Sequence, residues 1–199
     1  MSNSTDLTKV ITGKDTRWSY VTLWEPKSVR GGAPKYGVCL IIPKTDTETI
    51  KSIKMAIQAA YEEGKGRLQG SARAVPPLKA IKIPLRDGDK VKPDDPAYAN
   101  SYFINAKSVT RPGIVDANCK PILSHSEVYS GVYGRASISF YVFNVDGNKG
   151  IACGLNNLQK LRDGEPLGGV RSSAEEDFGI FEDEDVDTVE EENGDDLLA

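Results

Sequence analysis

Cysteine, histidine and long apolar runs are all scarce in this chain of 199 residues. The three cysteines, Cys39, Cys119 and Cys153, have no Cys-x-x-Cys spacing, and His125 is the one histidine. This set is too small for a disulfide framework or a zinc site, so we expect reduced thiols, a cytoplasmic location and no metal or cofactor. No window approaches 18 uninterrupted apolar residues and residues 1–8 are polar, so we expect neither a membrane span nor a secretory signal.

Catalytic signatures are also missing. The sequence has no P-loop, no Gly-x-Ser-x-Gly and no His-Glu-x-x-His, and the Gly-Lys-Gly-Arg at residues 64–67 lacks the Lys-Ser/Thr that ends a P-loop. Acidic residues before residue 172 fall mostly in turns, as at residues 87–89 and 94–95, where they have a turn-forming role. We therefore predict that the protein is not an enzyme.

Charge is distributed very unevenly. All 25 Lys and Arg lie at or before Arg171, while residues 1–174 contain 16 of the 29 Asp and Glu, which leaves this part at +9. Residues 175–199 contain the other 13 acids and no base. The chain is a cationic body joined to a polyanion, which points to a polyanionic partner for the body.

The composition divides the chain into three parts. We predict a flexible N-terminus at residues 1–14, a folded domain at residues 15–171 and a disordered acidic tail at residues 172–199. The tail is either a solubilising extension or a competitor that occupies the cationic surface until nucleic acid displaces it, and then recruits partner proteins. Apolar residues set among the acids favour the second interpretation, with candidate partner-binding residues Phe178, Phe181, Asp195, Asp196, Leu197 and Leu198.

The folded domain has the pattern of a mainly β protein with one main helix. Strands are predicted at residues 17–25, 35–42, 80–85, 101–107, 114–115, 128–145 and 150–155, with a helical turn at 158–161. Thr45 and Glu48 have the capping-box spacing and precede an apolar stripe that ends at Gly64, which predicts the helix. A small barrel or curled sheet carrying one helix accounts for this order.

The longest predicted strand separates its side chains by parity. Its even positions from 132 to 142 are apolar or small, whereas its odd positions include aromatic and basic residues. Outward-facing rings next to cations suit a single-stranded nucleic acid, because bases stack on the rings for about 1–3 kcal/mol each and cations neutralise phosphates. Similar mixtures occur on other strands, and the candidate DNA-binding residues are Arg17, Trp18, Trp24, Lys35, Tyr36, Phe103, Lys107, Arg111, Tyr133, Arg135, Tyr141 and Phe143.

Two other readings remain open at this point. One is an acidic-tailed interaction adaptor or assembly chaperone that binds protein rather than nucleic acid. The other is RNA binding, because a stacking platform does not by itself exclude a 2′-hydroxyl. A homodimer is also left open.

The strings YSGVYGRASISFYVFN at residues 129–144 and GNKGIACGLNNLQKLRDGEPLGG at residues 147–169 resemble the single-stranded DNA-binding proteins of bacteriophages and prophages. The opening RWSYV at residues 17–21, WEP at 24–26 and IIPKTD at 41–46 also fits this family, as does the acidic C-terminus. The resemblance implies an OB-fold-like barrel of five to six strands with an inserted helix. It also implies non-sequence-specific binding of single-stranded DNA in phage replication and recombination, in the host cytoplasm. Through the tail it implies recruitment of phage or host replication proteins, although this tail ends Asp-Asp-Leu-Leu-Ala rather than in the Ile-Pro-Phe type of tip of bacterial proteins.

Overall fold

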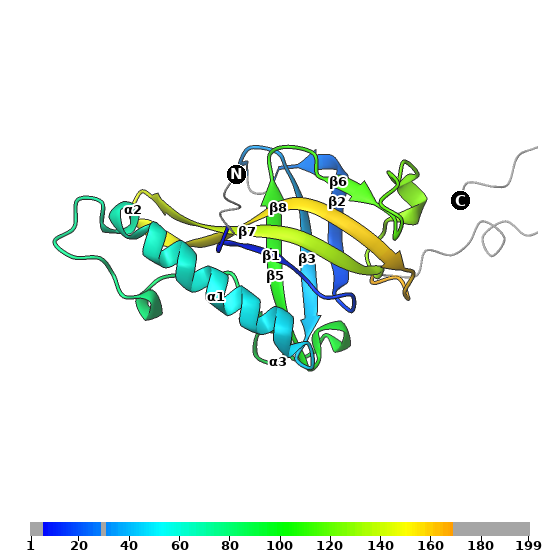
Figure 1. Ribbon diagram of the computed structural model, residues 1–199, viewed down its shortest axis with the longest axis horizontal. Helices are drawn as coiled ribbons and strands as arrows, with labels where there is room; N and C mark the ends of the chain where they lie inside the picture. The colour runs from blue at the N-terminus through cyan, green and yellow to red at the C-terminus, as the bar shows by residue number, and fades with distance from the viewer. Residues whose placement is uncertain (1–5, 29–30, 169–199) are drawn as a thin grey trace, which may run out of the picture. The chain divides into compact units, whose positions relative to one another are not determined.

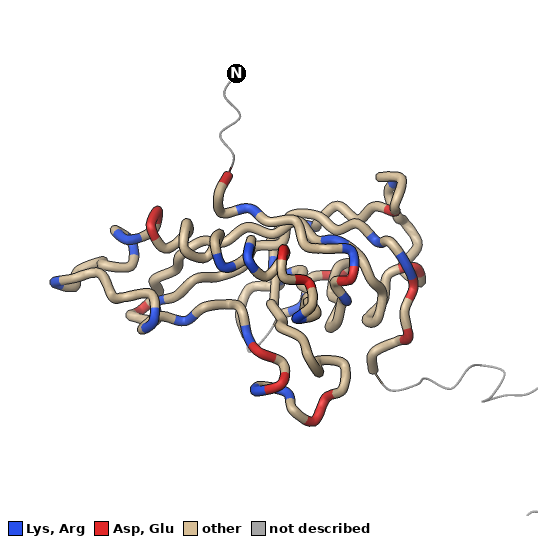
Figure 2. The backbone as a smooth tube through the Cα atoms, turned by 60° about the horizontal axis from the view of Figure 1, so that its bottom comes forward, with Lys and Arg blue, Asp and Glu red and all other residues tan. Residues whose placement is uncertain are grey.

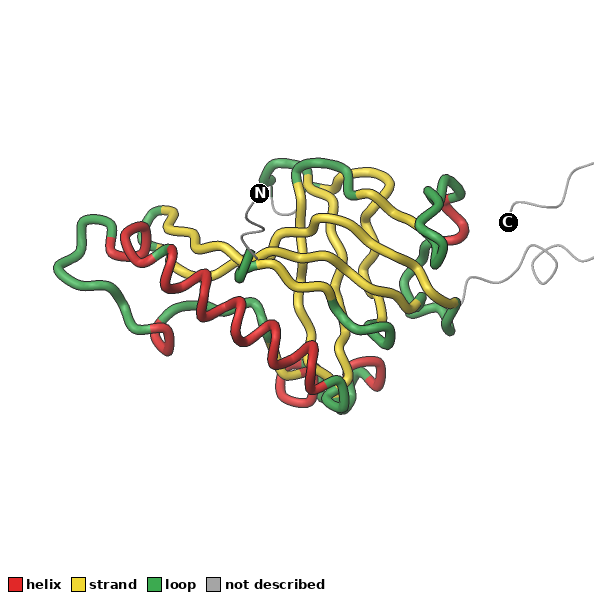
Figure 3. Tube along the Cα trace, viewed as in Figure 1, coloured by secondary structure: helices red, strands yellow, loops and turns green. Residues whose placement is uncertain are grey.

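The structure, a computed structural model, describes residues 6–28 and 31–168. The predicted disordered tail and its six candidate partner-binding residues lie outside the described residues. The helices and strands, shown in Figures 1 and 3, belong to one folded unit that ends at Gly168.

Strands dominate this unit. They are β1 (Lys9–Ile11), β2 (Arg17–Lys27), β3 (Lys35–Pro43), β4 (Arg86–Asp87), β5 (Ser101–Ser108), β6 (Gly113–Val115), β7 (Tyr133–Val145) and β8 (Asn148–Arg162). The α-helices are α1 (Thr47–Glu63), α2 (Lys65–Gln69) and α3 (Gly88–Val91), and the 3₁₀ turns are η1 (Leu78–Ala80), η2 (Pro96–Tyr98) and η3 (His125–Glu127). The predicted class, mainly β with one main helix, is confirmed.

Five of the strands form a closed ring. The pairing runs from β2 to β3, β5, β8 and β7 and returns to β2, and every pair is antiparallel except β5 with β8. Two of these strand pairs are narrow joints, because each has a single registered residue pair. Arg17 pairs with Tyr133 between β2 and β7, and Lys107 pairs with Gly154 between β5 and β8. This is the predicted OB-type barrel, a fold whose second and third strands bind oligonucleotides in other proteins.

The parity of β7 decides which side chains fill the barrel. Its even positions are buried, with Ile138 fully covered and Phe140 2% exposed, whereas Arg135 and Tyr141 on the odd side are exposed. The separation predicted from the sequence is therefore confirmed for this strand. Alternation in β3, β5 and β8 places Val38, Ala106 and Leu155 in the same core, so the opposite side of each strand faces outward.

Helix α1 is amphipathic and packs along β7 and β1 (Figure 1). Ile53 and Ile57 are buried in the core, as the apolar stripe predicts. The cap differs from the prediction: the side chain of Asp46, rather than that of Thr45, accepts the backbone N–H of Thr49 at 3.1 Å. An aspartate in this position also places negative charge at the positive end of the helix dipole.

Three local predictions are wrong. Residues 9–11 are not flexible: they form β1, because Val10 is buried and pairs with Ile138 of β7. Residues 80–85 form no strand, and only Lys82 bridges to Gly150. Residues 158–161 are strand rather than a helical turn, because β8 continues to Arg162 along β7.

Candidate nucleic-acid interface

One line of registered residues crosses six strands on the outward side of the barrel. Each residue is the direct partner of the next, and the line runs Thr22, Gly37, Lys107, Gly154, Ser139 and Lys9. We call it the cross-strand row. At about 4.8 Å between neighbouring strands its five steps span about 24 Å before allowing for curvature. The row contains two lysines, four small residues and no acid. It is therefore a positively charged line along which few side chains project from the sheet.

A basic pocket of about 320 Å³ lies at one end of the row, between the β2–β3 connection and β5. Its lining includes Lys27, Lys35 and Lys107, with Tyr36 as the aromatic member and Gly37 in its floor. Gly37 is fixed by its neighbour in the row, because the Thr22 hydroxyl donates a hydrogen bond to its carbonyl at 3.1 Å. Three predicted residues, Lys35, Tyr36 and Lys107, are thus brought together in one site.

Two aromatic side chains of β7 stand beside glycines of β8 further along the same face. The Tyr141 ring is 51% exposed and lies against Gly154 of the row. The Phe143 ring is half-buried against Gly150, its direct partner. The Asn156 amide donates to Ser139 at 2.9 Å and keeps the surface next to Tyr141 polar. Rings over a shallow polar surface are what base stacking requires.

A covering segment at residues 86–100 limits this face on one side. It contains β4, α3 and η2, and it buries the outward side of β3 and β5 under Tyr98. Phe103 is consequently only 2% exposed and packs edge-on against Tyr98 with ring centroids 5.2 Å apart. The sequence prediction that Phe103 contacts DNA is wrong in this structure, because both faces of its ring are covered.

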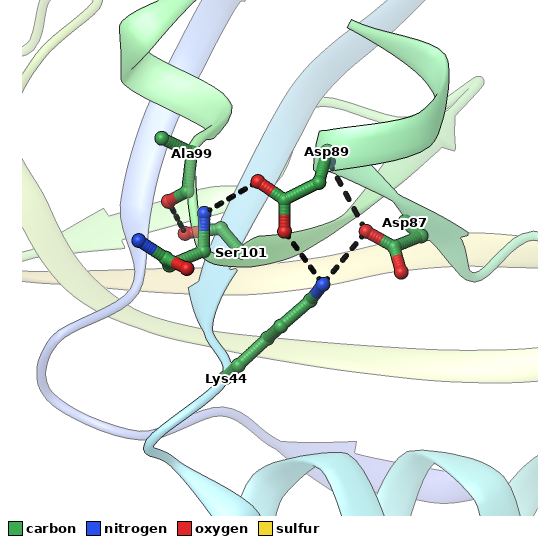
Figure 4. A network of polar contacts seen from close by, with 6 residues as sticks. Lys44, Asp87, Asp89, Ala99 and Ser101 are labelled. Atoms are coloured by element: carbon green, nitrogen blue, oxygen red, sulfur yellow. Dashed lines mark hydrogen bonds and ion pairs between the residues drawn. The ribbon is translucent and has the colours of Figure 1, made fainter. Parts of the chain in front are cut away.

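Ion pairs and cation–π contacts hold the covering segment in place. The Lys44 ammonium lies between the carboxylates of Asp87 and Asp89 (Figure 4), at 2.9 Å from the first and 2.7 Å from the second. Asp89 also accepts the backbone N–H of Asn100. These bonds raise the pKa of Lys44 and lower the pKa of both carboxyls. On the other side of the segment, the Lys92 ammonium lies 4.7 Å from the centroid of the Tyr20 ring of β2.

The structure also contradicts the prediction that Trp18 contacts DNA. Its side chain is fully buried, and its indole N–H donates to the carbonyl of Gly134 at 3.2 Å. Gly134 leaves the room that the ring needs, because a Cβ there would be 2.8 Å from Trp18 Cζ2. A ring enclosed in this way has no face for a base, so Trp18 is a core residue.

The remaining candidates lie in separate places. The Tyr133 ring is flanked by the guanidinium groups of Arg162 at 3.7 Å and Arg17 at 5.3 Å, at the opposite end of β7 from Tyr141. Arg17 also donates to the carbonyls of Gly131 and Glu165. These contacts occupy the Arg17 side chain with the protein itself.

Trp24 and Arg111 form a third group. The Trp24 ring stacks on His125 with centroids 4.3 Å apart, and the Arg111 guanidinium lies 5.3 Å from it. The indole N–H of Trp24 is buried with no hydrogen-bond partner among the described residues. Arg135 is exposed on the odd side of β7, between the Tyr133 group and the row.

Basic residues are not confined to the outward face. Figure 2 shows Lys and Arg along many parts of the described backbone. Lys51 and Lys54, for example, line a groove on α1 with Met55 and Tyr102. Charge alone therefore does not locate the site, and the cross-strand row is distinguished by its register, its small residues and the adjacent rings.

Sequence reasoning missed Lys9, Gly37, Gly154 and the neighbouring Lys27. Isolated glycines inside strand patterns were the available signal, since such positions mark bulges or close approach of another group. Lys9 was missed because β1 has only three residues and its pairing depends on β7.

Two negative findings apply to residues 6–28 and 31–168. No group of three or more His, Cys, Asp or Glu side chains there is arranged to hold a metal ion. Among the same residues, no helix is long and apolar enough to cross a membrane.

Comparison with known proteins identifies relatives that match most of this chain. The family model of the Enterobacter phage Enc34 ssDNA-binding protein matches residues 8–190. A protein designated p50 from Acyrthosiphon pisum secondary endosymbiont phage 1 is 32% identical over 182 residues, which cover 86% of this chain and 95% of that protein.

Solved structures agree with this match. The single-stranded DNA-binding protein from bacteriophage Enc34 in complex with ssDNA has a TM-score of 0.66 at 26% identity, covering 81% of this chain and 90% of that one. Protein gp2.5, a single-stranded DNA-binding protein encoded by bacteriophage T7, shares the fold, with a TM-score of 0.56 at 14% identity over 83% of this chain and 98% of that one. The chain belongs to the Enc34 single-stranded DNA-binding protein family of bacteriophages.

Proposed function

We propose that this protein binds single-stranded DNA without sequence specificity through the outward face that contains the cross-strand row. The observation that carries the proposal is the row itself: Lys107 lies between two glycines, with the basic pocket on one side and Tyr141 on the other. Lysines neutralise phosphates and the rings stack bases, and neither interaction depends on base identity. The solved Enc34 relative, which is in complex with ssDNA, supports the same ligand.

The residues that we propose to contact DNA fall into groups according to their place on this face. Lys35, Tyr36, Lys107 and Tyr141 form its centre, and Phe143, Arg135, Lys9 and Lys27 extend it along the same face. Arg17, Tyr133, Trp24 and Arg111 stay predictions, because they lie in other groups and already contact protein atoms.

We infer a non-enzymatic role in phage DNA replication and recombination, in the host cytoplasm, where such a protein coats transiently exposed strands. In this proposal the acidic tail lowers DNA affinity by competing for the cationic face and recruits phage or host replication proteins when displaced. Truncation after Arg171 is then expected to tighten binding at low salt, and unchanged or weaker binding would contradict the role of the tail.

The direct test is native mass spectrometry of the full chain with and without a 30-nucleotide oligo-dT. A complex of defined stoichiometry supports the proposal, and the same spectra report whether the protein is a monomer or a homodimer. Parallel titrations with oligo-rU and a duplex of equal length measure the preference for DNA over RNA and for single over double strands. Absence of a complex at low salt would overturn the proposed function.

A further inference from the structure

The outward face contains two glycines that the fold itself does not require. Five glycines lie within the described strands. A Cβ at Gly113, Gly134 or Gly150 would approach another atom to less than 3.0 Å. At Gly37 and Gly154 the nearest atoms would be 3.4 Å away or more, which is ordinary van der Waals contact.

Backbone conformation gives no reason for glycine at these two positions either. Neither Gly37 nor Gly154 is among the described residues with positive φ, in contrast to Gly131 and Gly147. Glycine in the interior of a strand weakens the strand, because it has no side chain to pack and loses more conformational freedom on folding. Two such residues, each the registered partner of Lys107, therefore need another explanation.

Their position supplies one. Gly37 lies in the floor of the basic pocket beside Tyr36, and Gly154 lies under the edge of the Tyr141 ring. Lys107 stands between them, and each glycine is one strand, about 4.8 Å, away. Gly154 is partly exposed, so a flat group can reach its backbone beside the Tyr141 ring directly. Gly37 is buried between the Thr22 and Lys107 side chains, so a flat group reaches its backbone when the flexible Lys107 side chain turns toward a phosphate.

We propose that Gly37 and Gly154 are two seats for neighbouring nucleotides of the bound strand, with Lys107 facing the phosphate between them. This inference rests on the proposed function and specifies how that site accepts its ligand. Gly37 and Gly154 act by leaving space, whereas Lys107 acts by its charge. The two kinds of residue must therefore respond differently to salt.

The test uses full-length G37A, G37V, G154A and G154V, each titrated with fluorescein-labelled oligo-dT of 30 nucleotides at several salt concentrations. The added side chains suit a strand, so thermal unfolding midpoints should stay equal or rise. Affinity should fall at least about threefold with alanine and at least about tenfold with valine. The dependence of log Kd on log salt should keep the wild-type slope, because no cation is removed.

G66A is the matched control, because Gly66 lies on α2 and outside the cross-strand row, with no atom within 4 Å of an added Cβ. It should bind as wild type. If valine unfolds the protein, the alanine variants decide the result.

The outcomes separate the two proposals. Failure of the wild type to bind oligo-dT overturns the proposed function and this inference with it. Wild-type binding together with folded glycine variants that bind within twofold of it overturns the inference alone. Loss of affinity with unchanged stability and unchanged salt slope supports it.

Discussion

Tyr141 and Gly154 lie side by side on adjacent strands, and a Cβ on Gly154 would be 3.4 Å from Cε1 of the Tyr141 ring. The ring is supported by the strand beneath it and is still half-exposed. A side chain held this way loses little further freedom when a base stacks on it, so it is the aromatic contact from which we expect the largest single contribution.

We expect Tyr141→Ala to weaken oligo-dT binding by about 1–3 kcal/mol, on the order of 5- to 150-fold in Kd. Tyr141→Phe keeps the ring and should bind as wild type. Fluorescence anisotropy at fixed salt measures both variants, and equal affinities of Tyr141→Ala and wild type would exclude a stacking role for this residue.

Lys107→Gln should reduce the salt dependence of binding. With about 4–6 phosphates neutralised, the slope of log affinity against log salt is expected to be about −3 to −4, and removing one contact should change it by about 0.7. Lys51→Gln removes the same charge from the outer side of α1 and serves as the control. Equal slopes for the two variants would mean that Lys107 is not a phosphate contact.

Trp18→Phe should affect stability and leave DNA affinity unchanged. Phenylalanine keeps an aromatic side chain but is smaller than the buried indole and cannot donate to the Gly134 carbonyl, so the free energy of unfolding should fall by about 1–3 kcal/mol. Urea denaturation measures that loss. A large drop in oligo-dT affinity of the folded variant would show that the burial of Trp18 is not its whole role.

Lys44→Met should weaken the attachment of the covering segment and change the acid response of the protein. Hydrogen bonds from Lys44 lower the folded-state pKa of Asp87 and Asp89 below the ordinary value of 3.8. Their stabilising contribution is therefore present above about pH 4 and is lost as the pH falls through the lowered values. The thermal midpoint of Lys44→Met should be lower at pH 7 and should approach that of wild type as the pH falls below 3.8, the ordinary pKa of the two carboxyls. A constant difference between the two proteins across that range would contradict the linkage.

The exposed thiol of Cys119 should react faster with a thiol reagent than the two buried thiols. Cys119 is exposed, whereas Cys39 and Cys153 are buried and burial raises the pKa of both thiols. Since the thiolate is the reactive form, we expect one thiol per native chain to react with an aromatic disulfide reagent at pH 8, and three after denaturation. Rapid reaction of all three in the native protein would show that the barrel opens readily.

The sequence predicted those features that depend on local periodicity. The parity of β7 and the apolar stripe of α1 were both accessible, because each follows from local alternation. The sequence offered Lys35, Tyr36 and Lys107 as separate candidates, and their proximity depends on the pairing of β3 with β5, which was not predicted. Burial of Phe103 was not accessible, because it results from Tyr98, which a connection of irregular sequence returns to the sheet. Trp18 was ambiguous for a related reason: both sides of β2 carry large apolar residues, and only the closed barrel decides which of them is inside.

Because β5 and β8 share only one registered pair, DNA bound along the row should stabilise the contact between these two strands. Lys107 and Gly154, the single registered pair that closes the barrel there, are also the middle of the track on which we place the DNA strand. A bound oligonucleotide would thus hold together the two strands at one of the two places where the barrel is closed by a single registered pair. Occupancy should be detectable as slower amide hydrogen exchange in β5 and β8, well beyond the residues that touch the ligand.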